Sequence, residues 1–166
     1  MSMLYLIRHS YAENSTNIRD KDRALTAEGL NTVRSLGRHL MKTSFNPSVI
    51  LCSTALRTRE TAINLAEELE IKEKNIIFKD TIYNASVREL LRELNTIKKS
   101  NDTEEVGMIG HNPSITYLAE YLTGESIGNM APSSLVTILF KNQSWSEISQ
   151  GSGSLISYFH PSQLNV

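Results

Sequence analysis

Apolar and polar positions alternate along the chain in blocks that predict strands, each followed by a helix. Apolar runs of three to five residues are too short for helices and end in polar residues, which is typical of strands buried on both faces of a sheet. Such runs lie at 3–7, 49–52, 76–78 and 106–109. Between them, apolar residues recur with helical spacing in the segments 30–41, 62–69, 87–97 and 115–122.

This alternation predicts the α/β class, in the form of a three-layer sandwich with a mostly parallel central sheet and helices on both faces. Thr26 is a candidate helix cap, and Pro113 suits the first position of a helix. The tail carries apolar runs at 135–140, 145–148 and 155–159, which we interpret as a strand meander that closes the sheet. The charged stretch 98–105 is interpreted as a surface connection. We find no repeat or linker and expect residues 1–166 to form one domain.

The amino-acid composition argues against several classes of protein. The 166 residues include 17 basic and 18 acidic side chains, so no broad positive surface is expected for nucleic acid or an anionic membrane. The one cysteine, Cys52, excludes an intrachain disulfide framework. No apolar run approaches the roughly 18 residues of a membrane helix, and the first ten residues lack the apolar core of a signal peptide. We therefore expect a soluble protein of the cytoplasm.

Polar residues of an unusual kind follow three of the predicted strands. Arg8 and His9 follow the first, the segment 53–57 with Arg57 follows the second, and His111 follows the fourth. Ligands of an open α/β sheet bind outside the carboxyl ends of its strands. The sequence therefore sends two histidines and two arginines to one edge of the sheet.

These four side chains suit phosphoryl transfer through a covalent intermediate. A neutral imidazole is a competent nucleophile toward phosphorus, and two guanidinium groups offer planar forks for the oxygens that carry the charge. Nearby arginines disfavour the imidazolium and keep the attacking histidine neutral. A second, protonated histidine would donate to the group in transfer.

Four motifs then carry a resemblance to a known family. Arg8-His9-Ser10 is similar to an Arg-His-Gly motif, the segment 53–62 is similar to the second motif of the same family, and the segments 22–29 and 110–113 follow in its order. The family is the histidine phosphatase superfamily, whose fold is called phosphoglycerate mutase-like. The resemblance extends from residue 3 to about residue 159, and it is nearest to the short, SixA-like phosphohistidine phosphatases.

The resemblance implies a role for each matching residue. His9 is implied to be the nucleophile that becomes phosphorylated, Arg8 and Arg57 bind the phosphoryl oxygens, and His111 is the second catalytic histidine. Ser10 stands where the family usually has glycine, so its side chain either fits a tight turn or contacts the phosphate. We also expect Asn112, which follows His111, to contact substrate.

Larger members of the family use a glutamate after the third strand as general acid, and Asp80 is the comparable residue here. A solvated loop carboxylate is the competing interpretation of Asp80. A phosphoramidate depends less on such an acid than a phosphate ester does, because its leaving imidazole takes a proton from solvent. The chain also shows no insertion long enough to form a lid. Both features favour phosphohistidine on another protein as the substrate.

Several alternatives stay open at this stage. Within the superfamily, the alternative is a small-molecule phosphomonoesterase; outside catalysis, it is a module that only binds phosphate. A metal site built from His9, His111 and a carboxylate such as Glu13 or Asp80 is disfavoured, because two arginines would repel the cation. We expect no cofactor and no metal. Asp22 and Arg23 either pair at the rim of the site or only precede the Thr26 cap.

Overall fold

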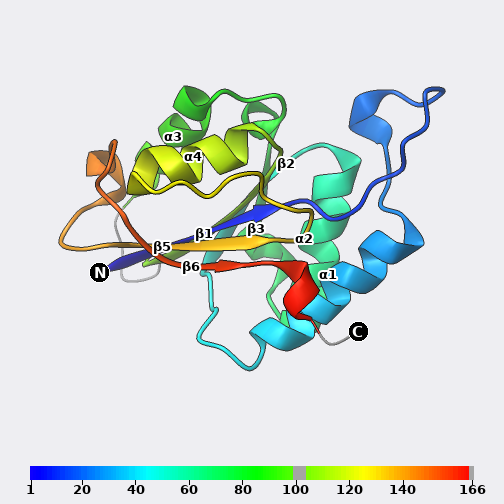
Figure 1. Ribbon diagram of the computed structural model, residues 1–166, viewed down its shortest axis with the longest axis horizontal. Coiled ribbons are helices and arrows are strands. Elements are labelled where there is room, and N and C mark those ends of the chain that lie inside the picture. Colours follow the sequence, from blue (N-terminus) through cyan, green and yellow to red (C-terminus); the bar gives the residue numbers. More distant parts are fainter. Residues whose placement is uncertain (99–103, 165–166) are drawn as a thin grey trace.

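The central element of the computed structural model, which describes residues 1–98 and 104–164, is a six-stranded sheet in the order β3-β2-β4-β1-β5-β6 (Figure 1). β1, β4, β2 and β3 are mutually parallel, β5 runs antiparallel to β1, and β6 runs antiparallel to β5. The predicted mostly parallel sheet is therefore confirmed. The strands are β1 Ser2–Arg8, β2 Val49–Ser53, β3 Ile76–Lys79, β4 Glu105–Gly110, β5 Leu135–Phe140 and β6 Ser154–Phe159.

Helices cover both faces of the sheet, as the alternating pattern predicts. One face carries α1 (Ala27–Leu40) and α2 (Leu56–Leu69), and the other carries α3 (Val87–Asn95) and α4 (Ser114–Thr123) (Figure 1). β1 shows why two cores form. Its side chains alternate, with Leu4 and Leu6 in the core beneath α3 and α4, and Tyr5 and Ile7 in the core beneath α1 and α2. All four are at most 4% exposed.

Local signals in the sequence explain where two of these helices begin. The Thr26 side chain accepts a hydrogen bond from the Gly29 amide and caps α1, as expected. α4 begins at Ser114, so Pro113 is the N-cap residue and not the first helical residue. Among the described helices, none is long and apolar enough to cross a membrane.

One predicted strand is wrong. The run 145–148 contains a short 3-10 helix, Trp145–Glu147, between β5 and β6. Ser144 and Glu147 close a capping box around it, which satisfies backbone groups locally and leaves no need for a strand partner. Trp145 fills the core beside Phe140, with ring centroids 6.1 Å apart, which explains an apolar residue at this position outside a strand. The predicted connection 98–105 lies largely outside the described residues, and its last residue, Glu105, begins β4.

Candidate active site

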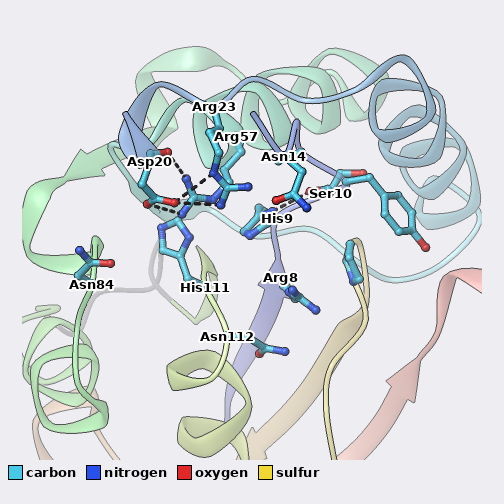
Figure 2. Close-up of a pocket in the computed structure, with 13 residues that line it drawn as sticks. Arg8, His9, Ser10, Asn14, Asp20, Arg23, Arg57, Asn84, His111 and Asn112 are labelled. Atoms are coloured by element: carbon cyan, nitrogen blue, oxygen red, sulfur yellow. Dashed lines mark hydrogen bonds and ion pairs between the residues drawn. The ribbon is translucent and has the colours of Figure 1, made fainter. Parts of the chain in front are cut away.

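The carboxyl ends of β1, β4 and β2 lie side by side in the sheet, and a polar cavity of about 600 Å³ opens beside them (Figure 2). The structure brings together the four side chains that the sequence sends to this edge. The rings of His9 and His111 lie 5.4 Å apart, centroid to centroid. The cavity is lined by Arg8, His9, Ser10, Tyr11, Ala12, Asn14, Asp20, Arg23, Arg57, Asn84, His111, Asn112 and Pro132.

His9 is buried at the cavity, and one nitrogen of its ring has a backbone partner. It is 9% exposed, and its Nδ1 lies 2.7 Å from the carbonyl oxygen of Ser10. A carbonyl oxygen only accepts, so Nδ1 carries the proton and Nε2 of the neutral ring keeps its lone pair. Burial, aided by the charges of Arg57 and Arg8, lowers the pKa of His9 from 6.5 to about 4. At neutral pH His9 is therefore an uncharged imidazole with Nε2 as its nucleophilic atom.

Ser10 is fully buried, and its hydrogen bonds hold the backbone next to His9 in place. Its hydroxyl donates to the Gly29 carbonyl at 2.7 Å, and its amide donates to Thr61 Oγ1 on α2 at 3.0 Å. These two bonds tie the end of β1 to both α1 and α2. The Ser10 hydroxyl is thus engaged with the protein, although the residue lines the cavity.

The two arginines come from different elements. Arg8 is the last residue of β1, and its Nη1 donates to the Met130 carbonyl at 2.8 Å. Arg57 lies in the first turn of α2 and is 5% exposed; its Nη1 donates to the Asp20 carbonyl and its Nη2 to the Asp20 carboxylate, at 2.7 and 3.1 Å. Burial lowers the pKa of Arg8 from its usual value.

Asp20 is a residue of the site that the sequence analysis missed. Its carboxylate accepts bonds from Arg57 and, at 3.0 Å, from Arg23 (Figure 2). It also accepts a bond from the hydroxyl of Tyr83 at 2.7 Å. The bond from Tyr83, together with the two guanidinium groups, lowers the pKa of Asp20 from 3.8 to about 2. The spacing of Asp20 and Arg23, three residues apart in a polar loop, is the signal that points to this pair. Arg23 pairs with Asp20, and Asp22 pairs with Arg19, so among the described residues Asp22 and Arg23 form no ion pair with each other.

His111 is held from the side of β2. Its Nε2 lies 2.8 Å from the hydroxyl of Ser53, the last residue of β2. Burial and the nearby charge of Arg57 lower the pKa of His111 from 6.5 to about 3. At neutral pH the second histidine is therefore uncharged as well.

Asp80 does not line the cavity. Its carboxylate is exposed and accepts hydrogen bonds from Lys21, at 2.7 Å, and from Thr54. The bond from Lys21 lowers the pKa of Asp80. This environment matches the competing interpretation of Asp80 as a loop carboxylate, and its role as general acid receives no geometric support.

The remaining histidines and the cysteine lie elsewhere. His39 stacks on Phe159, with ring centroids 4.5 Å apart, and His160 caps a short turn near the C-terminus. Cys52 is fully buried in β2, and burial raises the pKa of its thiol. Residues 1–98 and 104–164 contain no group of three or more histidine, cysteine, aspartate or glutamate side chains arranged to hold a metal ion.

Three buried nitrogen atoms at the cavity have no hydrogen-bond partner among the described residues: Arg8 Nε, Arg57 Nε and His111 Nδ1. Buried polar groups are nearly always paired in folded proteins, so a cluster of unpaired ones marks a place for a ligand. The ligand that suits two guanidinium groups and two imidazoles is an anion with several acceptor oxygens.

Comparisons with known proteins find similar sequences and a similar fold. The family model for the histidine phosphatase superfamily (branch 1) matches residues 4–80. The fold is similar to that of a protein histidine phosphatase SixA in complex with tungstate, at 20% identity and a TM-score of 0.84, over 98% of this chain and 99% of that one. It is also similar to a mycobacterial glucosyl-3-phosphoglycerate phosphatase, at 14% identity and a TM-score of 0.64, over 96% and 99%. An uncharacterised protein of Mycobacterium leprae is 26% identical, over 87% of this chain and 91% of the length of that protein.

The depressed pKa of His9 predicts how stability responds to acid. The pKa is about 4 in the folded protein and about 6.5 in the unfolded chain, so between these values only the unfolded chain takes up the proton. The contribution of His9 is present above pH 6.5 and is lost progressively as the pH falls toward 4. At pH 4.5 the loss is about 2 to 3 kcal/mol.

Urea unfolding at pH 7 and pH 4.5, in buffer without phosphate, measures this loss. The fall in unfolding free energy should be smaller by about that amount in His9→Ala, and unchanged in His39→Ala, whose ring lies outside the cavity. An equal fall in the wild type and both variants would show that His9 has an ordinary pKa.

Proposed function

We propose that the chain is a member of the histidine phosphatase superfamily, whose family model matches residues 4–80, and that it is a metal-independent phosphatase that removes phosphate from phosphohistidine on another protein. The observation that carries the proposal is the state of His9. A neutral ring, with Nδ1 fixed by the Ser10 carbonyl and Nε2 unprotonated, faces a cavity that two guanidinium groups line. This is the arrangement that nucleophilic attack on a phosphoryl group requires.

The reaction has two displacement steps. In the first, the lone pair of His9 Nε2 forms a bond to phosphorus as the bond from phosphorus to the substrate imidazole breaks. That electron pair stays on the leaving nitrogen, which takes a proton from water. In the second, water attacks the phosphorus of phosphorylated His9, releasing inorganic phosphate and restoring the neutral ring. Arg8 and Arg57 hold the oxygens on which charge accumulates in both steps.

His111 changes its protonation state with ligand. Burial and the charge of Arg57 hold its pKa low. A phosphoryl dianion brings negative charge close to the ring and raises the pKa of His111, which favours the protonated form. His111 then donates to an oxygen of the group in transfer and stabilises it.

The carboxylates near the cavity favour phosphohistidine over a phosphate ester. Asp80 lies outside the cavity, and Asp20 is ionised within it. An ionised carboxylate holds no proton to give to a departing alkoxide, and its charge opposes the negative charge that develops there. A departing imidazole is protonated by solvent and carries no such charge.

A small-molecule phosphomonoesterase is the second candidate. The cavity of about 600 Å³ is lined by the side-chain amides of Asn14 and Asn84, both exposed at its rim, which suit the hydroxyl groups of a sugar phosphate. We keep phosphohistidine as the proposal because ester cleavage needs a proton donor that neither Asp20 nor Asp80 supplies. The proposed partner is a phosphorylated signalling or phosphotransfer protein, and the proposed location is the cytoplasm.

A substrate panel tests the proposal. Phosphate release is measured from a histidine phosphotransfer protein phosphorylated with phosphoramidate, from p-nitrophenyl phosphate and from 3-phosphoglycerate, each with and without EDTA. We expect the phosphohistidine protein to be cleaved fastest, and His9→Ala to lose turnover by about 10⁴-fold or more because the nucleophile is gone. His39→Ala is the matched control and should keep full activity. Preference for either ester would establish the second candidate, and loss of activity in EDTA would overturn the metal-independent mechanism.

A comparison of two arginines on α2 tests whether Arg57 binds the phosphoryl group or only adds positive charge to the protein. Arg57 lines the cavity, whereas Arg59 lies against the Phe78 ring, 4.2 Å from its centroid, and does not. We expect Arg57→Ala to lower kcat/KM by about 10²- to 10³-fold, as for loss of one preorganised group that stabilises the transition state. Arg59→Ala should change it by less than about twofold. Equal losses in the two variants would remove Arg57 from the phosphoryl site.

A further inference from the structure

The carbonyl of Met130 is the acceptor that orients the guanidinium of Arg8. Met130 is fully buried in the segment between α4 and β5, and its carbonyl accepts from Arg8 Nη1 and from Asn112 Nδ2, each at 2.8 Å. The position of this one oxygen therefore fixes a charged donor of the cavity. The same oxygen also links Arg8, at the end of β1, to the loop after β4 that carries His111.

A closed ring of hydrogen bonds holds Met130 in place. The hydroxyl of Thr116 donates to Asn112 Oδ1 at 2.6 Å and accepts from the Met130 amide at 3.2 Å. The amide group of Asn112 completes the ring through its bond to the Met130 carbonyl, and it donates to Asn129 Oδ1 at 2.7 Å as well. Both ends of the Asn112 side chain are thus bonded to the protein, although the residue lines the cavity.

The position of the Arg8 side chain depends on this ring of hydrogen bonds. Its side chain is half-buried, and its Nε is buried with no partner among the described residues. Long charged side chains lose much rotamer freedom when they are held in one position, so the acceptor that holds them must itself be fixed. A carbonyl in a loop is fixed only as well as the loop is, and here both the amide and the carbonyl of Met130 are bonded to the ring.

We infer that Asn112 and Thr116 are positioning residues, which act through the Met130 carbonyl to hold the Arg8 guanidinium in place for a phosphoryl group. The inference rests on the proposed function for the identity of the anion. It gives Asn112 a different role from direct contact with substrate. Thr116, which is 3% exposed and does not line the cavity, affects anion binding from outside it.

The test uses Thr116→Val, which keeps the shape of the side chain but removes both of its bonds, and Thr116→Ser, which keeps the hydroxyl. Tungstate affinity is measured by calorimetry on the purified protein, with kcat and KM for the phosphohistidine protein alongside. We expect Thr116→Val to weaken tungstate binding by about five- to tenfold and to raise KM in proportion. Thr116→Ser should restore both to within about twofold. Thr123→Val is the matched control on α4, because its hydroxyl bonds to the Ala119 carbonyl and not to the ring.

A merely structural role makes a different prediction. If the ring only stabilises the fold, Thr116→Val lowers Tm while tungstate affinity stays unchanged, and the inference is overturned. The Arg8→Ala background sharpens this distinction. There, Thr116→Val should change tungstate affinity by less than about twofold, because its effect passes through Arg8; an undiminished effect would also overturn the inference.

Two further outcomes are distinguishable. A wild-type protein that binds no tungstate refutes the proposed function itself, whereas normal wild-type binding with an unchanged Thr116→Val variant refutes only the positioning role. If Thr116→Val does not fold, Asn112→Leu breaks the ring from its other side without adding charge. It is expected to weaken tungstate binding by the same factor, and unchanged binding there would refute the inference.

Discussion

The hydrogen bond from His9 Nδ1 to the carbonyl of Ser10 is the contact from which the chemistry of the site follows. It determines which ring nitrogen carries the proton, and so leaves Nε2 with the lone pair that the proposed nucleophile needs. The backbone that carries this carbonyl is held from two sides, by the Ser10 hydroxyl on the Gly29 carbonyl and by the Ser10 amide on Thr61. Gly29 allows this closeness, since a Cβ at that position would overlap the carbonyl oxygen of Tyr11.

Burial of several cations at one edge of the sheet is the second constraint. Arg8, Arg23 and Arg57 line a cavity that also contains two histidines, and Asp20 is the carboxylate that bonds to two of the arginines. Burial and the positive charges together lower the pKa of both histidines, so both rings are uncharged at neutral pH. The same charges favour an incoming dianion. The arrangement therefore disfavours a second proton on His9 and favours an anion beside it.

Much of this arrangement follows from the sequence, because it depends on periodicity and on strand ends. Apolar runs predict four parallel strands, and topology then requires that Arg8, His9 and His111 meet at one edge. Asp20 could not be predicted in this way, because its position depends on the path of a polar loop over the cavity and not on a repeating pattern. Asp80 follows a predicted strand, yet β3 is an edge strand, two strands away from β4 and three from β1.

Side-chain partners are the other part that the sequence leaves open. Whether Ser10 and Asn112 face a ligand or the protein depends on contacts with Gly29, Met130 and Thr116, which are distant in the sequence. Trp145 is a second example. In the sequence it looks like a buried strand residue, whereas in the structure it lies in a short 3-10 helix and packs against Phe140. Patterns of apolar residues predict elements, whereas hydrogen-bond networks depend on how those elements pack.

The most direct measurement is the site of the phosphoryl group in the trapped enzyme intermediate. Acid quenching would destroy phosphohistidine, so the protein is stopped with alkali during turnover and studied by nitrogen-phosphorus correlation in NMR, with peptide mapping of the modified residue. Because the Ser10 carbonyl occupies Nδ1, the account predicts a phosphoryl group on Nε2 of His9. A phosphoryl group on Nδ1 of His9, or on His111, would contradict it.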